Sequence, residues 1–424
     1  MNHWKHALAE AFGASVDESD TSSGPADSLR SRSPAAVLAQ LQATGGNLRI
    51  SRLIDLTPLD TVGLCVFSAV VPNGVTDCYT NGKGPDRDTA LVSALMEAYE
   101  LHAISQPVAP RVLHARTLGE VQALGRSVDP NSLPLPVVQS FAPDARFDWI
   151  PALELGTCEE HYLPADLFSF AYGNGPISQS AGAYATSGGK AAGSSAFDAL
   201  LHALLELVER DAFVISQYDP QRSLDVSELA REPGAAALLE RLHALGVEVF
   251  LFELTTELGV PVVKACLAEP SGFGQVHIHK GLAAHVDRPL AAYRALLEAC
   301  QVRLTYFVGS RDDVGEGPAP DSALDALRTH HRNAARAANA RALAGRGQLI
   351  DAIEGVRSAL ARVGCSRVYV ANLSDPRVGL PALACYVPQL EGLYPGEHGL
   401  RLGQRGEAAR ARSRARGDDG GLAY

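Results

Sequence analysis

The sequence predicts a mixed α/β (α+β) fold in a single large domain. Strand-like apolar runs, such as residues 64–71 and 247–254, alternate with segments whose apolar residues recur every three or four positions. Acidic motifs near residues 97, 206 and 298 lie on three different predicted helices and must meet to share one ligand, which keeps them in one domain. The chain has 424 residues and is 46% hydrophobic, which is enough for a sizeable core.

The two ends of the chain differ from its middle in composition. Residues 13–34 are rich in Ser, Asp, Gly and Pro, so we expect disorder there, between short helices at 1–12 and 35–41. The segment 400–424 holds six arginines among Gly, Ala and Asp, and we interpret it as a disordered end, with a basic docking segment as the alternative. The predicted organisation is a mostly disordered segment at 1–47, the main domain at 48–395 and an Arg/Gly-rich tail at 396–424.

Three predicted helices each carry two acidic or amide side chains on one face. Residues three apart on a helix are neighbours, so the two side chains of each helix project together. A single pair of this kind is usually a solvated charged face, but three pairs indicate carboxylates that converge on a divalent metal, and Mg²⁺ prefers such oxygen ligands. The helices are Asp88–Ala103 with Ser93, Glu97 and Glu100, Ala196–Asp211 with Glu206 and Glu209, and Leu290–Phe307 with Glu298 and Gln301.

The remaining elements are predicted from shorter patterns. Alternating or continuous apolar runs bounded by Gly and Pro predict strands, and longer amphipathic stretches predict helices. The polar loop 171–186 is either a plain surface connection or a backbone lining for a nucleotide. Strands are expected at 48–71, 76–80, 149–155, 247–254, 260–267, 276–282, 368–372 and 382–387, and helices at 118–124, 225–245 and within the charged region 311–345.

Two motifs invite a specific assignment. Asn81-Gly-Lys-Gly84 is predicted to be a loop whose glycines let the backbone approach a ligand while Lys83 supplies a positive charge. It is not a P-loop, which needs Ser or Thr after the Lys, and Lys190 fails the same test. His277 and His279 share one strand face, but a zinc site is disfavoured because no third ligand lies near them in the sequence.

Charge and cysteine content narrow the function classes. The net charge of −11 argues against a general nucleic-acid binder, which carries a basic face. The seven cysteines show neither zinc-site spacing nor a disulfide framework and indicate a reducing compartment. The longest apolar run, 62–71, is too short to span a bilayer, and the N-terminus lacks the apolar core of a signal peptide. We therefore expect a cytoplasmic protein without a nucleic-acid or membrane partner.

Five motifs together resemble the YcaO family in order and spacing: GKG at 82–84, SALMEAYE at 93–100, SGGKAAGSS at 187–195, ALLHALLELVERDAF at 199–213 and LLEACQVR at 296–303. The resemblance covers residues from about Arg52 to about Gly392 and implies a YcaO-like fold of mixed sheets flanked by helices. It also implies ATP and Mg²⁺ as cofactors. It assigns Glu97, Glu100, Glu206 and Glu209 to Mg²⁺, and Lys83, Ser93, Arg210, Glu298, Gln301 and Arg303 to phosphate or nucleotide contacts, with no separate catalytic residue.

The resemblance implies an enzyme that phosphorylates a backbone amide oxygen of a ribosomally made peptide. Attack by a Cys, Ser or Thr side chain then gives an azoline, and attack by a sulfur donor gives a thioamide. Azoline-forming members commonly end in a proline-rich tail, whereas this chain ends Gly-Gly-Leu-Ala-Tyr424, which makes thioamide formation competitive. The implied partners are a precursor peptide and a separate peptide-recruiting or TfuA-like protein; a homodimer is left open.

The sequence departs from the family pattern at two positions. Leu101 stands where the family often has Arg, and Gly188 stands where it usually has Asn. The four acidic residues assigned to Mg²⁺ are all present, which favours an active enzyme. The alternative is a non-catalytic accessory factor that keeps the fold and binds a nucleotide or a partner protein.

Overall fold

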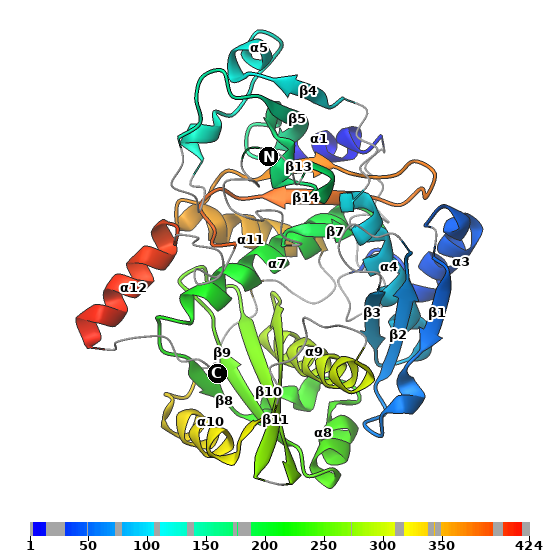
Figure 1. Ribbon diagram of the computed structural model, residues 1–424, viewed down its shortest axis with the longest axis vertical. Coiled ribbons are helices and arrows are strands. Elements are labelled where there is room, and N and C mark those ends of the chain that lie inside the picture. Colours follow the sequence, from blue (N-terminus) through cyan, green and yellow to red (C-terminus); the bar gives the residue numbers. More distant parts are fainter. Residues whose placement is uncertain are drawn as a thin grey trace.

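Strand pairing divides the protein into three antiparallel sheets, each with helices packed against it (Figure 1). This agrees with the predicted mixed α/β class. The computed structural model describes residues 3–13, 30–48, 50–72, 79–105, 111–133, 140–172, 176, 188–272, 274–309, 318–337, 343, 349–392 and 402–417.

The first sheet is three-stranded, with helix α4 (Arg87–Ser105) packed on it. A Cβ added at Gly82 would lie 1.9 Å from the backbone nitrogen of Ala94, and one at Gly84 would lie 2.7 Å from that of Ala90. The glycines therefore allow close helix packing. Asn81–Gly84 is part of a strand, which corrects the predicted loop. The strands, in sheet order, are β1 (Arg52–Asp55), β2 (Cys65–Val70) and β3 (Tyr79–Gly84).

The second sheet has five strands and is covered on one face by α9 (Arg288–Val308). Gly281 lets α9 pack closely on its strand, as Gly82 does for α4, because a Cβ at Gly281 would lie 2.2 Å from the carbonyl oxygen of Ala295. α10 (Asp321–Asn333) packs on the same sheet through Leu324 and Leu327. In sheet order the strands are β12 (Ala319–Pro320), β11 (Gln275–Ala284), β10 (Val262–Gly272), β9 (Glu248–Glu253) and β8 (Arg222–Leu224).

The third sheet lies beside α7 (Ala196–Ile215), the helix that connects it to the second sheet. α7 contacts β14 and β7 of the third sheet and β10 and β11 of the second, and α11 (Leu349–Arg362) packs on it as well. Because it contacts elements on several sides, 15 of its 20 residues are buried. The strands are β4 (Leu113–Arg116), β5 (Phe147–Glu154), β13 (Tyr369–Asn372), β14 (Ala382–Tyr386) and β7 (Lys190–Ala192), with β6 (Glu159–Pro164) paired to β5.

The expected helix at 225–245 is interrupted. It consists of a 3-10 helix over Val226–Arg231 and α8 (Ala235–Ala244). Gly234 between them has φ +81°, a left-handed conformation that a continuous α-helix does not contain. The other helical elements are α1 (His3–Ala11), α3 (Pro34–Thr44), α5 (Leu118–Gln122) and the 3-10 helices Gly45–Leu48, Thr57–Leu59, Pro130–Ser132, Ala165–Leu167 and Phe170–Tyr172.

The expectation of a disordered C-terminal tail is wrong for residues 404–416. These residues form α12 (Gln404–Arg416), which lies against the end of α7 (Figure 1). Three of its arginines pair with acids elsewhere in the chain: Arg405 with the buried Asp211, and Arg412 and Arg416 with Asp219. Composition alone did not reveal these partners because they lie about 200 residues earlier in the sequence.

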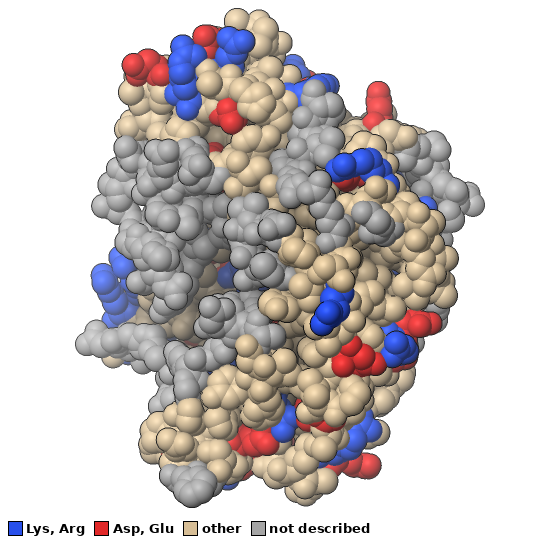
Figure 2. Space-filling model, turned by 45° about the vertical axis from the view of Figure 1, so that its right-hand side comes forward, with Lys and Arg blue, Asp and Glu red and all other residues tan. Residues whose placement is uncertain are grey.

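Two expectations fall mainly outside the described residues: the disorder of 13–34 and the role of the loop 171–186. Among the described residues, no helix is both long and apolar enough to cross a membrane. On the face in Figure 2, acidic and basic side chains lie side by side at the top and at several places in the lower half. The six described cysteines are free thiols.

Candidate functional site

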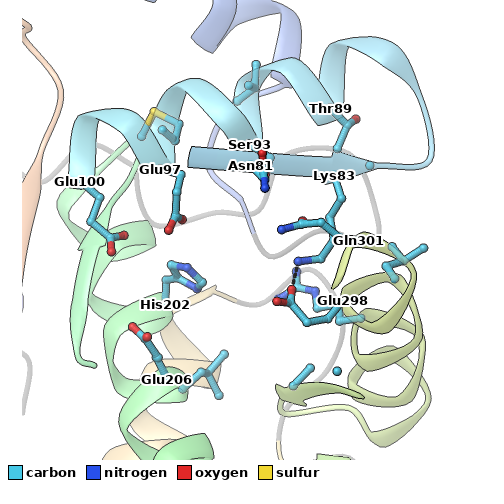
Figure 3. A pocket seen from close by; sticks show the side chains of 18 of the residues that line it. Asn81, Lys83, Thr89, Ser93, Glu97, Glu100, His202, Glu206, Glu298 and Gln301 are labelled. Atoms are coloured by element: carbon cyan, nitrogen blue, oxygen red, sulfur yellow. Dashed lines mark hydrogen bonds and ion pairs between the residues drawn. The ribbon is translucent and has the colours of Figure 1, made fainter. Parts of the chain in front are cut away.

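A cavity of about 1090 Å³ lies between α4, α7 and α9 (Figure 3). Strand β3 forms part of one wall, and β11 forms part of another. The cavity faces of the three helices carry the acidic and amide residues predicted to converge. The described structure brings all the predicted site residues to this cavity except Arg303: they are Lys83, Ser93, Glu97, Glu100, Glu206, Glu209, Arg210, Glu298 and Gln301.

Ion pairs and backbone groups hold several of these side chains in place. Lys83 on β3 pairs with Glu298 on α9, across the cavity wall (Figure 3). Glu206 accepts a hydrogen bond from the backbone N–H of Gly189 at 3.2 Å, and Glu209 accepts one from Ala284 at 3.3 Å. Arg210 lies 3.5 Å from Glu206 through Nη2 and Oε1. The α7 carboxylates are therefore oriented by neighbours on both flanking sheets.

Burial makes three carboxylates of this cavity hard to ionise, those of Glu100, Glu206 and Glu209. It raises the pKa of Glu206 to about 7 and that of Glu209 to about 8, and nearby carboxylates add to the effect while Arg210 opposes it. Burial also raises the pKa of Glu100, with Glu97 and Glu206 contributing repulsion. Such a set gains electrostatic stabilisation from an added cation.

The residues present fit a divalent cation bound together with phosphate groups. Within the described ranges, no three acidic, His or Cys side chains are gathered closely enough to hold a metal by themselves. Mg²⁺ is usually held by only one or two carboxylates together with substrate phosphates, which suits carboxylates spread over several walls. The buried oxygens Asn81 Oδ1 and Gln301 Oε1 have no hydrogen-bond partner among the described residues. Buried polar atoms normally find partners, so these two suit a bound polar ligand.

Arg303, predicted to contact the nucleotide, does not line the cavity. Its Nη1 lies 2.7 Å from Asp60 Oδ1, and its Nε lies 2.8 Å from Glu269 Oε2. The reason is helical geometry, because Arg303 lies two positions after Gln301 and so about 200° around α9. It is an anchor on the far side of the helix.

Several charged or ring-bearing cavity residues were not predicted from the sequence, among them Arg30, Arg32, His202 and Arg294. Burial lowers the pKa of His202 to about 3, and the positive charges of Arg30 and Arg294 contribute. Burial, with Arg30, also lowers the pKa of Arg294 to about 10. These groups add positive charge and a neutral imidazole beside the cavity's carboxylates.

An internal repeat would have revealed two of them. The three helices share the pattern Ala-Leu-Leu/Met-Glu-x-x-Glu/Gln, at 94–100, 203–209 and 295–301. The residue just before each pattern lies one turn ahead of its first Glu and shares its face. Those residues are Ser93, His202 and Arg294, and all three line the cavity.

The two departures from the family pattern lie close to this cavity. Leu101 lines it with an apolar side chain. The carbonyl of Gly188 accepts a hydrogen bond from the buried Lys190 at 3.3 Å. The Lys190 ammonium is near enough to Glu206 and Glu100 to favour their ionised forms. The Lys190 ammonium therefore supplies a positive charge beside Glu206 and Glu100, a charge that Leu101 cannot supply.

Comparisons with known proteins agree with the motif evidence. An uncharacterised protein of Methanothermobacter thermautotrophicus is 33% identical over 281 residues, which cover 64% of this chain and 71% of that protein. A Rhizobium leguminosarum bv. trifolii protein, described as uncharacterised and in the tfuA 3′ region, is 28% identical over 403 residues, covering 89% and 91%. The structure of YcaO from Methanopyrus kandleri bound with AMPPCP and Mg²⁺ has a TM-score of 0.69 at 21% identity, covering 90% of this chain and 98% of that one.

The family comparison covers the cavity motifs. Residues 81–391 match the family model described as YcaO cyclodehydratase, ATP- and Mg²⁺-binding. That segment includes all three repeats of the helical pattern and excludes Arg30, Arg32 and α12. The predicted resemblance is thereby confirmed, and the predicted cofactors agree with the family's description: the chain belongs to the YcaO family.

Proposed function

We propose that this protein uses ATP and Mg²⁺ to phosphorylate a backbone amide oxygen of a ribosomally made peptide. The observation that carries the proposal is the convergence of five carboxylates from α4, α7 and α9 on one cavity that also holds Lys83, Arg210 and Arg294. A cavity that holds both carboxylates and cationic side chains suits a triphosphate with its bound metal better than it suits the metal alone or the triphosphate alone.

In this proposal the protein's own side chains position and neutralise charge. Phosphorylation turns the amide oxygen into a good leaving group, and bound Mg²⁺ would neutralise charge on the phosphates. Glu97, Glu100, Glu206 and Glu209 would hold the metal when it is bound. Lys83, Arg210 and Arg294 contact phosphate oxygens, while Ser93 and Gln301 donate hydrogen bonds.

The product is proposed to be an azoline or a thioamide. The Rhizobium relative is described by its place in the tfuA 3′ region, which supports a TfuA-like partner protein and the thioamide branch. The free thiols are compatible with a reducing compartment, so we place the reaction in the cytoplasm, with a precursor peptide as substrate.

The test is a calorimetric titration of the protein with AMPPCP in the presence and absence of Mg²⁺. We expect binding that needs Mg²⁺ and that weakens by about tenfold or more in Glu206→Gln and Glu209→Gln. Each variant removes one negative charge and keeps nearly the same side-chain volume. Glu240→Gln, a control on α8 away from the cavity lining, should bind as the wild type does.

Unchanged affinity in both cavity variants would remove these residues from the metal site. Turnover separates the enzyme from an accessory factor. An enzyme releases phosphate with its precursor peptide and partner protein, whereas an accessory factor binds nucleotide without turnover under the same conditions.

A further inference from the structure

α7 carries its cavity residues on one face and a buried acid on the opposite face. His202, Glu206 and Glu209 line the cavity. Asp211 lies two positions after Glu209 and therefore points about 200° away around the helix. Its relative exposure is 0%, and burial raises its pKa. A carboxylate so placed is costly unless a charged partner and hydrogen bonds compensate it.

The C-terminal helix α12 supplies that partner. Arg405 donates from Nε to Asp211 Oδ1 at 2.9 Å and from Nη2 to Oδ2 at 2.8 Å. The backbone N–H of Glu391 donates to Oδ1 at 3.1 Å. The Arg405 side chain is itself only 9% exposed, and it also reaches Glu257 at 2.7 Å. Two parallel bonds from one planar guanidinium fix direction as well as distance.

α12 is held at two separate places. At its start, the Glu391 carboxylate accepts N–H bonds from Gly403 at 2.8 Å and Gly406 at 2.7 Å, where the helix dipole favours a negative charge. Nearer its end, Arg412 Nη2 donates a hydrogen bond to Asp219 Oδ2 at 2.6 Å. Only the first attachment involves Asp211, so the two can be broken independently.

On each of the three cavity helices, the residue two positions after the second acid or amide of the repeat anchors the helix to a charged partner. These residues are His102, Asp211 and Arg303. His102 Nε2 lies 3.1 Å from Asp375 Oδ2, and Arg303 Nη1 lies 2.7 Å from Asp60 Oδ1. All three anchors are buried. Two of the partners lie outside the matched family segment 81–391: Arg405 for α7 and Asp60 for α9.

We propose that Arg405 is a positioning residue, which holds Asp211 and thereby fixes the rotation of α7 that presents Glu206 and Glu209 to the cavity. This inference rests on the proposed function for its nucleotide readout. Loss of Arg405 leaves Asp211 buried without its countercharge. The end of α7 then rotates or loosens, and the carboxylates lose their fixed position relative to α4.

The experiment compares Arg405→Met with the double variant Arg412→Gln/Arg416→Gln, which releases the outer end of α12 from Asp219. All proteins are titrated with AMPPCP and Mg²⁺ well below their Tm. We expect Arg405→Met to weaken binding about fivefold or more, in the usual range of coupling between separate sites. The matched double variant should keep the wild-type Kd even where its Tm falls.

A rescue variant separates position from stability. In Asp211→Asn/Arg405→Gln the buried charge is absent and the neutral side chains retain hydrogen-bonding groups, so we expect affinity to return toward the wild-type value. A fall in Tm for Arg405→Met with an unchanged Kd would overturn the inference. So would equal loss of affinity in Arg405→Met and the Arg412/Arg416 double variant.

A second readout keeps the inference testable if the wild type binds no nucleotide, an outcome that would reject the proposed function. Amide hydrogen exchange reports local opening without any ligand. We expect Arg405→Met to lose protection at residues 206–212 of α7, and the Arg412/Arg416 double variant to keep it. Equal protection in both would overturn the positioning role.

Discussion

The helices α4 and α9 line the same cavity and are built alike, yet they carry different charge. Each packs on a glycine of its neighbouring strand, Gly82 or Gly281. The α4 repeat ends in Glu100, whereas the α9 repeat ends in Gln301. Glu100 on α4 lies near Glu206 and Lys190, whereas Glu298 on α9 forms an ion pair with Lys83.

This difference indicates a division of the cavity. Shared packing sets the distance between helix and strand, and one changed side chain sets the local charge. Under the proposed function, we expect the cation toward the α4 and α7 carboxylates and the phosphate oxygens toward Lys83 and Gln301. Variants at the helix anchors, at the packing glycines and at the titrating carboxyls test how far α4 and α9 differ.

The largest expected effect is at the anchors. Arg303→Met on α9 leaves Asp60 and Glu269 without their cation, and Asp60 is only 8% exposed. We expect a loss of about 3–5 kcal/mol in the free energy of unfolding. His102→Gln on α4 should cost less, about 1–2 kcal/mol, because Asp375 keeps its bonds to Arg377.

Urea unfolding of both variants measures how much free energy of unfolding each one loses. Equal costs would show that the α9 anchor is no stronger than the α4 anchor. The Kd for AMPPCP and Mg²⁺ adds a second measurement: a large loss of affinity in Arg303→Met without a loss of stability would restore Arg303 as a direct ligand residue.

A smaller effect is expected at the packing glycines. Gly82→Ala would place a Cβ 1.9 Å from the Ala94 nitrogen, and Gly281→Ala would place one 2.2 Å from the Ala295 carbonyl oxygen. Because backbone atoms cannot move aside cheaply, we expect each change to cost about 1–3 kcal/mol or more. Thermal unfolding checks this, with Gly119→Ala as control, since nothing lies within 4 Å of a Cβ there. A stability loss in the control as large as in the two variants would count against the packing explanation.

The helices α4 and α9 also show which features can be predicted from the sequence and which cannot. Apolar periodicity and acidic spacing predicted α4, α7 and α9 and the residues on their cavity faces, because a helix converts spacing into direction. The same rule, applied to Arg303, would have placed it behind α9. The break at Gly234 was visible in the sequence as a Pro-Gly pair.

Other features depend on contacts between distant residues. That Asn81–Gly84 is a strand follows from its pairing with β2 and from the approach of α4, neither of which local composition reveals. The polar composition of the tail predicts disorder, but Asp211 gives Arg405 a buried partner. Such long-range ion pairs cannot be read from a single segment.

The last expected effect is a pH dependence of binding on the α4 and α7 side of the cavity. The pKa of Glu206 is raised to about 7 and that of Glu209 to about 8, so both carboxyls hold protons increasingly as the pH falls below those values. Under the proposed function both carboxyls are metal ligands, which must be ionised, so binding of Mg²⁺ would release those protons. The affinity for Mg²⁺ with AMPPCP should fall as the pH is lowered from about 8 to about 6, by up to about tenfold per unit for each proton displaced.

Gln301 cannot titrate, so the α9 wall should contribute nothing to this slope through that position. Calorimetric titrations at several pH values measure the slope for the wild type, Glu206→Gln and Gln301→Ala. Protonation of the nucleotide itself is common to all three proteins, and only Glu206→Gln should give a shallower dependence because it lacks one titrating group. An identical slope in wild type and Glu206→Gln would mean that this carboxylate takes up no proton that the metal must displace, and would exclude Glu206 as the source of the pH dependence.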